Sequence, residues 1–232
     1  IRVELRSNAA AGAQATFNGL VLNGAQQTVR GVAIGGFRVG ITGGNATADR
    51  VVIEGNFLGL NAAGTVAVPN GVGVGFFSGT PSNLRIGTNG DNTTDLAERN
   101  VISGSVENGI FVAAVSAGIV IAGNVVGLNA AGTAALANGQ SGIQLVGTSG
   151  ARIGTNGDGM ADLAERNVLS GNARSGILAG GVSGTVIAGN YVGLNAAGTA
   201  AVRNATGISI VSTSIGTRIG TNGDGNNDTA ER

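Results

Sequence analysis

Acidic side chains gather in three equivalent segments of this 232-residue sequence. The second segment, GTNGDGMADLAE, matches the calcium-loop pattern at its Asn, Asp, Gly and final Glu positions, where a glycine-bent loop wraps oxygen ligands around the ion. Nine of the thirteen acidic residues are therefore candidate Ca²⁺ ligands: Asp91, Asp95, Glu98, Asp158, Asp162, Glu165, Asp224, Asp228 and Glu231.

A second interpretation assigns these acids a structural role. The first liganding position of the calcium pattern falls on Gly87, Gly154 or Gly220, which offer no side-chain oxygen. The segments TDLAER and ADLAER could instead form a short helical turn that begins near Thr94 or Asp158. Arginines flank all three segments and could neutralise the acids, and this Arg-paired turn is the favoured interpretation: Arg85 and Arg99, Arg152 and Arg166, Arg218 and Arg232.

The composition excludes several kinds of chemistry. The chain has no Cys and no His, so disulfides, Cys/His zinc sites and histidine-dependent catalytic triads are impossible. Zero net charge without a single Lys argues against a nucleic-acid partner. No apolar run approaches the roughly 18 residues of a membrane span, so we expect no membrane insertion.

The acidic segments recur because the whole chain repeats. The motif GNFLGLNAAGT from Gly55 returns as GNVVGLNAAGT from Gly123 and GNYVGLNAAGT from Gly189, which gives a unit of about 67 residues from about residue 51 onward. Each unit divides into two halves of three short apolar segments, with inserted loops at 130–141 in one half and 157–166 in the other. Residues 1–28 are less regular and resemble one earlier coil. We therefore expect a single solenoid over 1–232 with about seven coils and three short strands per coil.

Like residues recur at equivalent positions and should stack in columns. One predicted interior column is isoleucine: Ile53, Ile86, Ile121, Ile153, Ile187 and Ile219. Three residues further on comes an unbroken asparagine column, predicted to form an amide ladder: Asn56, Asn89, Asn124, Asn156, Asn190 and Asn222. A second polar column is predicted at Asn61, Ser105, Asn129, Asn172 and Asn195, whereas Asn138 falls in an inserted loop.

These repeats resemble a known family. The segments NVISGS…NGIFV (100–112) and NVLSGN…SGILA (167–179), with the three GLNAAGT motifs, are similar to the NxIxGN…GIxL repeats of right-handed parallel β-helix proteins on bacterial surfaces and in the periplasm, within the pectin-lyase-like superfold. The resemblance runs from about residue 29 to the end of the chain. It implies an all-β, right-handed, single-stranded parallel β-helix, a fold that hosts lyases, hydrolases, adhesins and spacers alike.

Catalysis is not the favoured interpretation, because an active site is normally unique and these acids occur three times. Successive acidic loops should lie roughly 10 Å apart, which is loose for an acid–base pair. The plausible exposed aromatics for a carbohydrate platform are Phe76, Phe77 and Tyr191, but Tyr191 and its equivalent Phe57 are favoured as packing variants.

We therefore expect a non-catalytic structural or adhesive segment of a longer secreted or cell-surface bacterial protein. The alternatives are a polysaccharide-binding or polysaccharide-degrading domain and an engineered consensus scaffold. The apolar AAGT loops are expected to fold over the side of the solenoid. Its ends could self-associate, because the last segments carry no polar cap.

Overall fold

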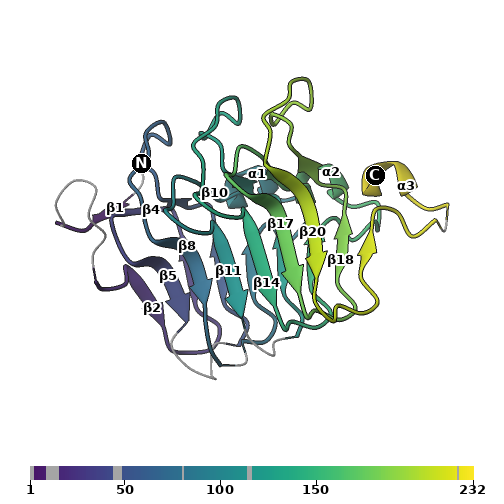
Figure 1. Cartoon of the computed structure of the whole chain (residues 1–232), viewed down its shortest axis with the longest axis horizontal. Coiled ribbons are helices and arrows are strands. Elements are labelled where there is room, and N and C mark those ends of the chain that lie inside the picture. Colours follow the sequence, from purple (N-terminus) through teal and green to yellow (C-terminus); the bar gives the residue numbers. More distant parts are fainter. Residues whose placement is uncertain (1–2, 9–15, 44–48, 80, 114–116, 224) are drawn as a thin grey trace.

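The computed structural model describes residues 3–8, 16–43, 49–79, 81–113, 117–223 and 225–232. The chain winds through three parallel sheets in turn, once per coil, and forms the expected right-handed parallel β-helix of seven coils (Figure 1). Two of the three segments expected in each coil are strands of only two or three residues in most coils, so pairing with the coils above and below must stabilise them.

Each sheet has seven strands, and the strands follow chain order along the solenoid. Sheet A contains β1 (Val3–Arg6), β4 (Val32–Gly35), β7 (Phe57–Leu58), β10 (Val101–Ile102), β13 (Val125–Val126), β16 (Val168–Leu169) and β19 (Tyr191–Val192). Sheet B contains β2 (Leu20–Leu22), β5 (Val39–Gly43), β8 (Val72–Phe76), β11 (Ile110–Ala113), β14 (Ile143–Val146), β17 (Ser175–Gly180) and β20 (Thr206–Val211). Sheet C contains β3 (Thr28–Arg30), β6 (Val52–Glu54), β9 (Arg85–Gly87), β12 (Val120–Ala122), β15 (Arg152–Gly154), β18 (Val186–Ala188) and β21 (Arg218–Ile219).

The interior is built from in-register apolar columns. The predicted isoleucine column is confirmed in sheet C, where each isoleucine pairs with the next from Ile53 to Ile219. Its members from Ile53 to Ile187 are at most 2% exposed, whereas Ile219 in the last coil is 54% exposed. Matching columns in the other two sheets complete one continuous core.

A ladder of buried asparagines runs along the corner that precedes sheet A. Its members are Asn56, Asn100, Asn124, Asn167 and the partly buried Asn190, and each of the first four donates a side-chain N–H to the side-chain oxygen of the next, over 2.9 to 3.1 Å. The predicted ladder members Asn89 and Asn156 are wrong: they are exposed and bond Asp91 and Asp158 within the acidic loops. In these coils the acidic loop lies between Asn89 or Asn156 and the corner before sheet A. Asn100 and Asn167, which follow the loop, therefore occupy the ladder instead.

The second predicted polar column also needs correction. Asn61, Asn129 and Asn195 do not stack with Ser105 and Asn172, because their side chains close the AAGT loops through the backbone N–H groups of Thr65, Thr133 and Thr199. The true partners run from Asn138 to Asn172 and from Asn172 to Asn204, over 2.9 and 3.0 Å. Asn138 is thus fully buried in a ladder. Ser105 interrupts this ladder, and its buried hydroxyl has no hydrogen-bond partner.

We predict that Asn124→Ala lowers the free energy of unfolding by about 2–3 kcal/mol, because the buried side chains of Asn100 and Asn167 each lose their hydrogen bond to Asn124. Ser105→Ala is the matched control and should change stability by less than about 0.5 kcal/mol, because its hydroxyl makes no hydrogen bond. Urea unfolding with a constant m-value measures both. Equal effects in the two variants would contradict the ladder assignment.

Candidate functional site: the acidic loops and the faces of the solenoid

The acidic loops form a layer over the outer side of sheet C. Each loop leaves sheet C and makes one helical turn, and the first two loops then lead into β10 and β16 of sheet A. The turns are α1 (Asp95–Glu98), α2 (Asp162–Glu165) and α3 (Asp228–Glu231), and neighbouring turns contact one another. The predicted helical turn is confirmed. Thr94, however, is not a side-chain cap: its φ is 61° and its hydroxyl makes no capping bond.

Two carboxylates hold the second acidic loop in shape. The Asp162 carboxylate accepts hydrogen bonds from the Thr155 hydroxyl at 2.6 Å and from the Gly159 backbone N–H at 3.1 Å. The Thr155 hydroxyl in turn accepts the backbone N–H of Gly157 at 3.0 Å. At the loop tip, Asp158 accepts the Met160 N–H at 2.8 Å and the Asn156 side-chain N–H at 2.8 Å. Both carboxylates therefore accept hydrogen bonds from N–H groups of their own loop and stabilise its conformation.

The third carboxylate, Glu165, is buried beneath the loop. It is 1% exposed, accepts the Asn156 backbone N–H at 3.0 Å and pairs with Arg152 at 2.9 Å. Burial raises the pKa of Glu165, and the charge of Arg152 acts in the opposite direction. Arg152 lies on the outer side of β15 and thus neutralises the acid from the sheet below.

The same bonds recur in the other two loops. Asp95 and Asp228 accept hydroxyl bonds from Thr88 and Thr221. Glu98 and Glu231 accept backbone N–H groups at 3.0 and 2.9 Å. Asp91 accepts the Thr93 N–H and the Asn89 side chain, and hydrogen bonding from Asn89 lowers its pKa. Asp224, the remaining candidate ligand, lies outside the described residues.

The arginine prediction holds for one arginine of each flanking pair. Arg85, Arg152 and Arg218 pair with the glutamate of their own loop over 3.5, 2.9 and 3.6 Å. Arg85 also binds Glu54 at 2.8 Å, a buried partner from the preceding coil that the repeat pattern did not reveal. Arg99 and Arg166 instead donate to the carbonyls of Gly123 and Gly189.

The described carboxylates do not converge on a common point. Among the described residues there is no group of three or more acidic side chains that could hold a metal ion. Calcium binding stays a prediction without geometric support, because each carboxylate is turned toward its own backbone, hydroxyl or guanidinium partner.

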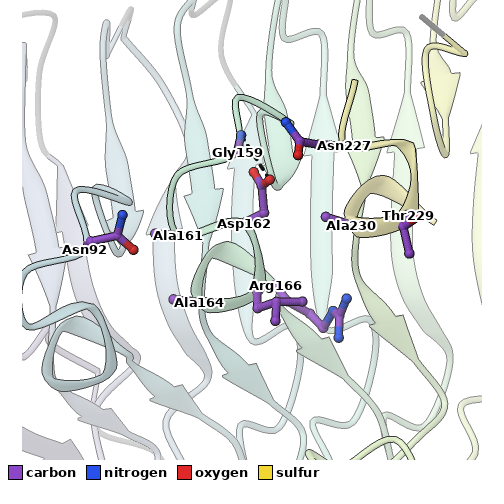
Figure 2. A pocket seen from close by; sticks show the side chains of 10 residues that line it. Asn92, Gly159, Ala161, Asp162, Ala164, Arg166, Asn227, Thr229 and Ala230 are labelled. Atoms are coloured by element: carbon purple, nitrogen blue, oxygen red, sulfur yellow. Dashed lines mark hydrogen bonds between the residues drawn. The ribbon is translucent and has the colours of Figure 1, made fainter. Parts of the chain in front are cut away.

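A groove of about 740 Å³ lies around α2, between the acidic loops. Figure 2 shows Asp162 and Arg166 in it, with Asn92 on one side and Asn227 and Thr229 on the other. Asp162 is its one described carboxylate, 8% exposed and bonded to the loop. Arg166 is its one described cation, and its guanidinium carbon lies 4.1 Å from the centre of the Tyr191 ring. The described lining of the groove therefore offers one carboxylate, whereas acid–base cleavage of a glycosidic bond typically uses two.

The AAGT loops cover sheet A, as predicted. Each closes into a narrow hairpin and binds the next loop through backbone hydrogen bonds, from Ala130 to Gly64 and from Ala196 to Gly132, both 2.9 Å. Beneath them lies a second apolar cluster that contains Phe57, with Tyr191 packed against it. Gly132 has φ 66°, and a Cβ there would lie 2.3 Å from that of Ala196, so glycine permits the close approach of the loops.

The outer side of sheet B carries no such cover. Figure 1 shows its strands at the front of the molecule, with no described loop crossing them. Phe77 is 45% exposed there and stacks on the partly buried Phe111, with 5.1 Å between the ring centres. Phe76 was expected among the exposed aromatics, and that expectation is wrong: it is 1% exposed, because the alternation of the strand turns it inward. Phe111 was missed, although the alternation in IFVA could have placed it outside.

No protein-family model, curated protein or solved structure matches the chain. Nor is any helix among the described residues long and apolar enough to cross a membrane.

We predict that Arg152→Met destabilises the protein by about 2–4 kcal/mol at pH 8, because it leaves Glu165 charged, buried and without its cation. The pKa of Glu165 in the folded state already lies above its usual value, and losing Arg152 raises it further. The folded state then binds more protons than the unfolded state, so the free energy of unfolding falls as pH rises through the carboxyl's titration range. The difference in free energy of unfolding between Arg152→Met and the wild type should be small below about pH 4 and reach its full size at pH 8.

The control for this experiment is the double variant Arg152→Met/Glu165→Gln, whose acid no longer titrates. Its deficit should not change between the two pH values when both are measured by urea unfolding. A pH-independent deficit in the single variant would contradict the role given to Arg152.

We predict that the melting temperature stays constant when millimolar Ca²⁺ is added or removed with a chelator. A ligand that binds only the folded state must raise the melting temperature, so the titration decides between the two interpretations of the acidic loops. A rise with Ca²⁺ that is lost in Asp158→Asn would restore the calcium hypothesis, with Asp49→Asn, which lies outside the loops, as control.

Proposed function

We propose that this chain is a structural or adhesive β-solenoid segment of a longer secreted or cell-surface bacterial protein, and that it is not a catalyst. One observation carries the proposal. In each of the three acidic loops the described carboxylates serve the loop itself, with the same partners every time. A reaction centre would require at least one carboxylate that is not engaged by its own loop and can reach a substrate, with a pKa suited to proton transfer.

The architecture supports a role in extension and display. Coils that contact only their neighbours give a rod whose length grows with the number of repeats. The backbone is held by in-register ladders in all three sheets, and two of the sheets are further covered by loops that bind one another. Such a body offers few unpaired segments to a protease.

We predict that the protein cleaves acidic polysaccharides neither by hydrolysis nor by β-elimination, and that it resists proteolysis under native conditions. Reducing-end and unsaturated-product assays measure turnover, and a glycan array measures binding. Array binding without turnover would support the adhesive branch, whereas protease resistance without array binding would support the purely structural branch.

Turnover of any polysaccharide would contradict the proposal and favour the polysaccharide-degrading alternative. Two variants locate such an activity. Asp162→Asn changes the one described carboxylate of the α2 groove, and Asp95→Asn changes the equivalent residue one repeat earlier. Rapid degradation of the folded protein by protease would contradict the structural role separately.

A further inference from the structure

The outer side of sheet B differs chemically from the rest of the solenoid. Two outward columns cross it. One follows the register Val21, Thr42, Gly75, Phe111, Gln144, Leu178 and Ser209, and the other contains Ala113, Val146, Gly180 and Val211. Phe77 directly follows β8, and the alternation of the strand places it one position beyond Phe76, at the level of Ala113. Within these described positions there is no charged residue, although thirteen arginines and thirteen acids occur in the chain. Neutral, apolar and aromatic surface is typical of the centre of homodimer interfaces.

One end of this face carries an aromatic ridge. The Phe77 ring lies over Gly75, where a Cβ would come within 2.4 Å of it, and stacks on Phe111 at an angle of 29°. Gly75 therefore supports the ring from below and Phe111 supports it from the side. A half-exposed aromatic side chain that is held in this way loses little conformational entropy when a partner covers it.

The other end of the face carries a hollow of about 350 Å³. Val146, Leu178 and Val211 form its apolar walls, and glycines at 147, 180 and 181 leave its floor open. Gly180 lies in the same outward column as Phe77, three strands further along the sheet in the order β8, β11, β14, β17. Ridge and hollow are thus at one level along the strands and roughly 14 Å apart.

We propose that sheet B pairs face to face with sheet B of a second copy of this chain. A two-fold axis that runs parallel to the strands, between β11 and β14, exchanges β8 with β17 and keeps the level along each strand. It brings Phe77 of each copy over Leu178 and Gly180 of the other. A two-fold interface requires such a self-complementary surface, with the same ridge and hollow used twice.

The remaining outward positions agree with the same axis. The axis sets Val146 opposite Ala113, so a larger side chain meets a smaller one. Because the described positions of the face are uncharged, no like charges oppose each other when the face meets itself. The covered area, with six strands per copy, is about 800–900 Å² in total, which places the dimer among weak, reversible complexes.

Sedimentation equilibrium of the 232-residue chain tests the proposal, from about 10 µM to about 1 mM, the range in which weak complexes form. We expect a reversible monomer–dimer equilibrium. Phe77→Glu and Gly180→Arg should each weaken dimerisation at least tenfold. Gly180 does not have a left-handed φ, and a Cβ there lies 3.2 Å from Val211, so the arginine side chain can leave the sheet. Leu163→Glu is the matched control, because Leu163 is 69% exposed on α2, away from sheet B.

Mixing the two variants provides the sharpest test. In a mixed dimer Glu at position 77 faces Arg at position 180, while the second contact keeps the native Phe and Gly. Phe77→Glu and Gly180→Arg should therefore form a heterodimer more tightly than either forms a homodimer, and circular dichroism checks that both variants fold.

Three results would overturn the proposal: a wild-type chain that stays monomeric at the highest concentration, a Leu163→Glu variant as disruptive as Phe77→Glu, or a mixture that does not restore pairing. Oligomers larger than a dimer that persist in Phe77→Glu would indicate association through the ends of the solenoid instead.

Discussion

In-register pairing between successive coils is the interaction on which the rest of this structure depends. Many strands have two or three residues, too few to bury an apolar face or complete a hydrogen-bond network alone. Stacked coils supply both. Isoleucine meets isoleucine inside sheet C, and a buried asparagine donates to the next asparagine at the corner. A change at one ladder position therefore affects the coils on both sides, whereas distant coils are affected little.

The two-coil repeat follows from how the outer faces are covered. A loop over sheet A in one coil and a loop over sheet C in the next leave room for each to spread across two strands. Successive loops then touch: the AAGT loops bind through their backbones, and a Cβ at Gly90 would lie 2.5 Å from the Glu165 carboxylate of the next acidic loop. Arg85, Arg152 and Arg218 occur in every second coil because only β9, β15 and β21 lead directly into an acidic loop.

This arrangement explains why clustered acids need not indicate a reaction. A loop that returns across a sheet exposes backbone N–H groups that strand pairing cannot satisfy. Short carboxylates and a threonine hydroxyl accept them, and an arginine from the sheet neutralises the one acid that is fully buried. Sheet B has no inserted loop in the described residues, so its outward side chains determine how that face behaves.

Sequence periodicity is enough to predict the repeat length, the solenoid fold, the isoleucine column, the helical turns and the covering role of the AAGT loops. Each of these depends on a local pattern that recurs at a fixed spacing. Which asparagines stack depends instead on how the coils are arranged in three dimensions. Asn89 and Asn124 each follow an isoleucine of the sheet C column by three residues, but a loop inserted after Asn89 moves it off the corner and brings Asn100 into the ladder. The ladder is a contact between coils, and its membership is fixed by which residues the inserted loops bring to the corner.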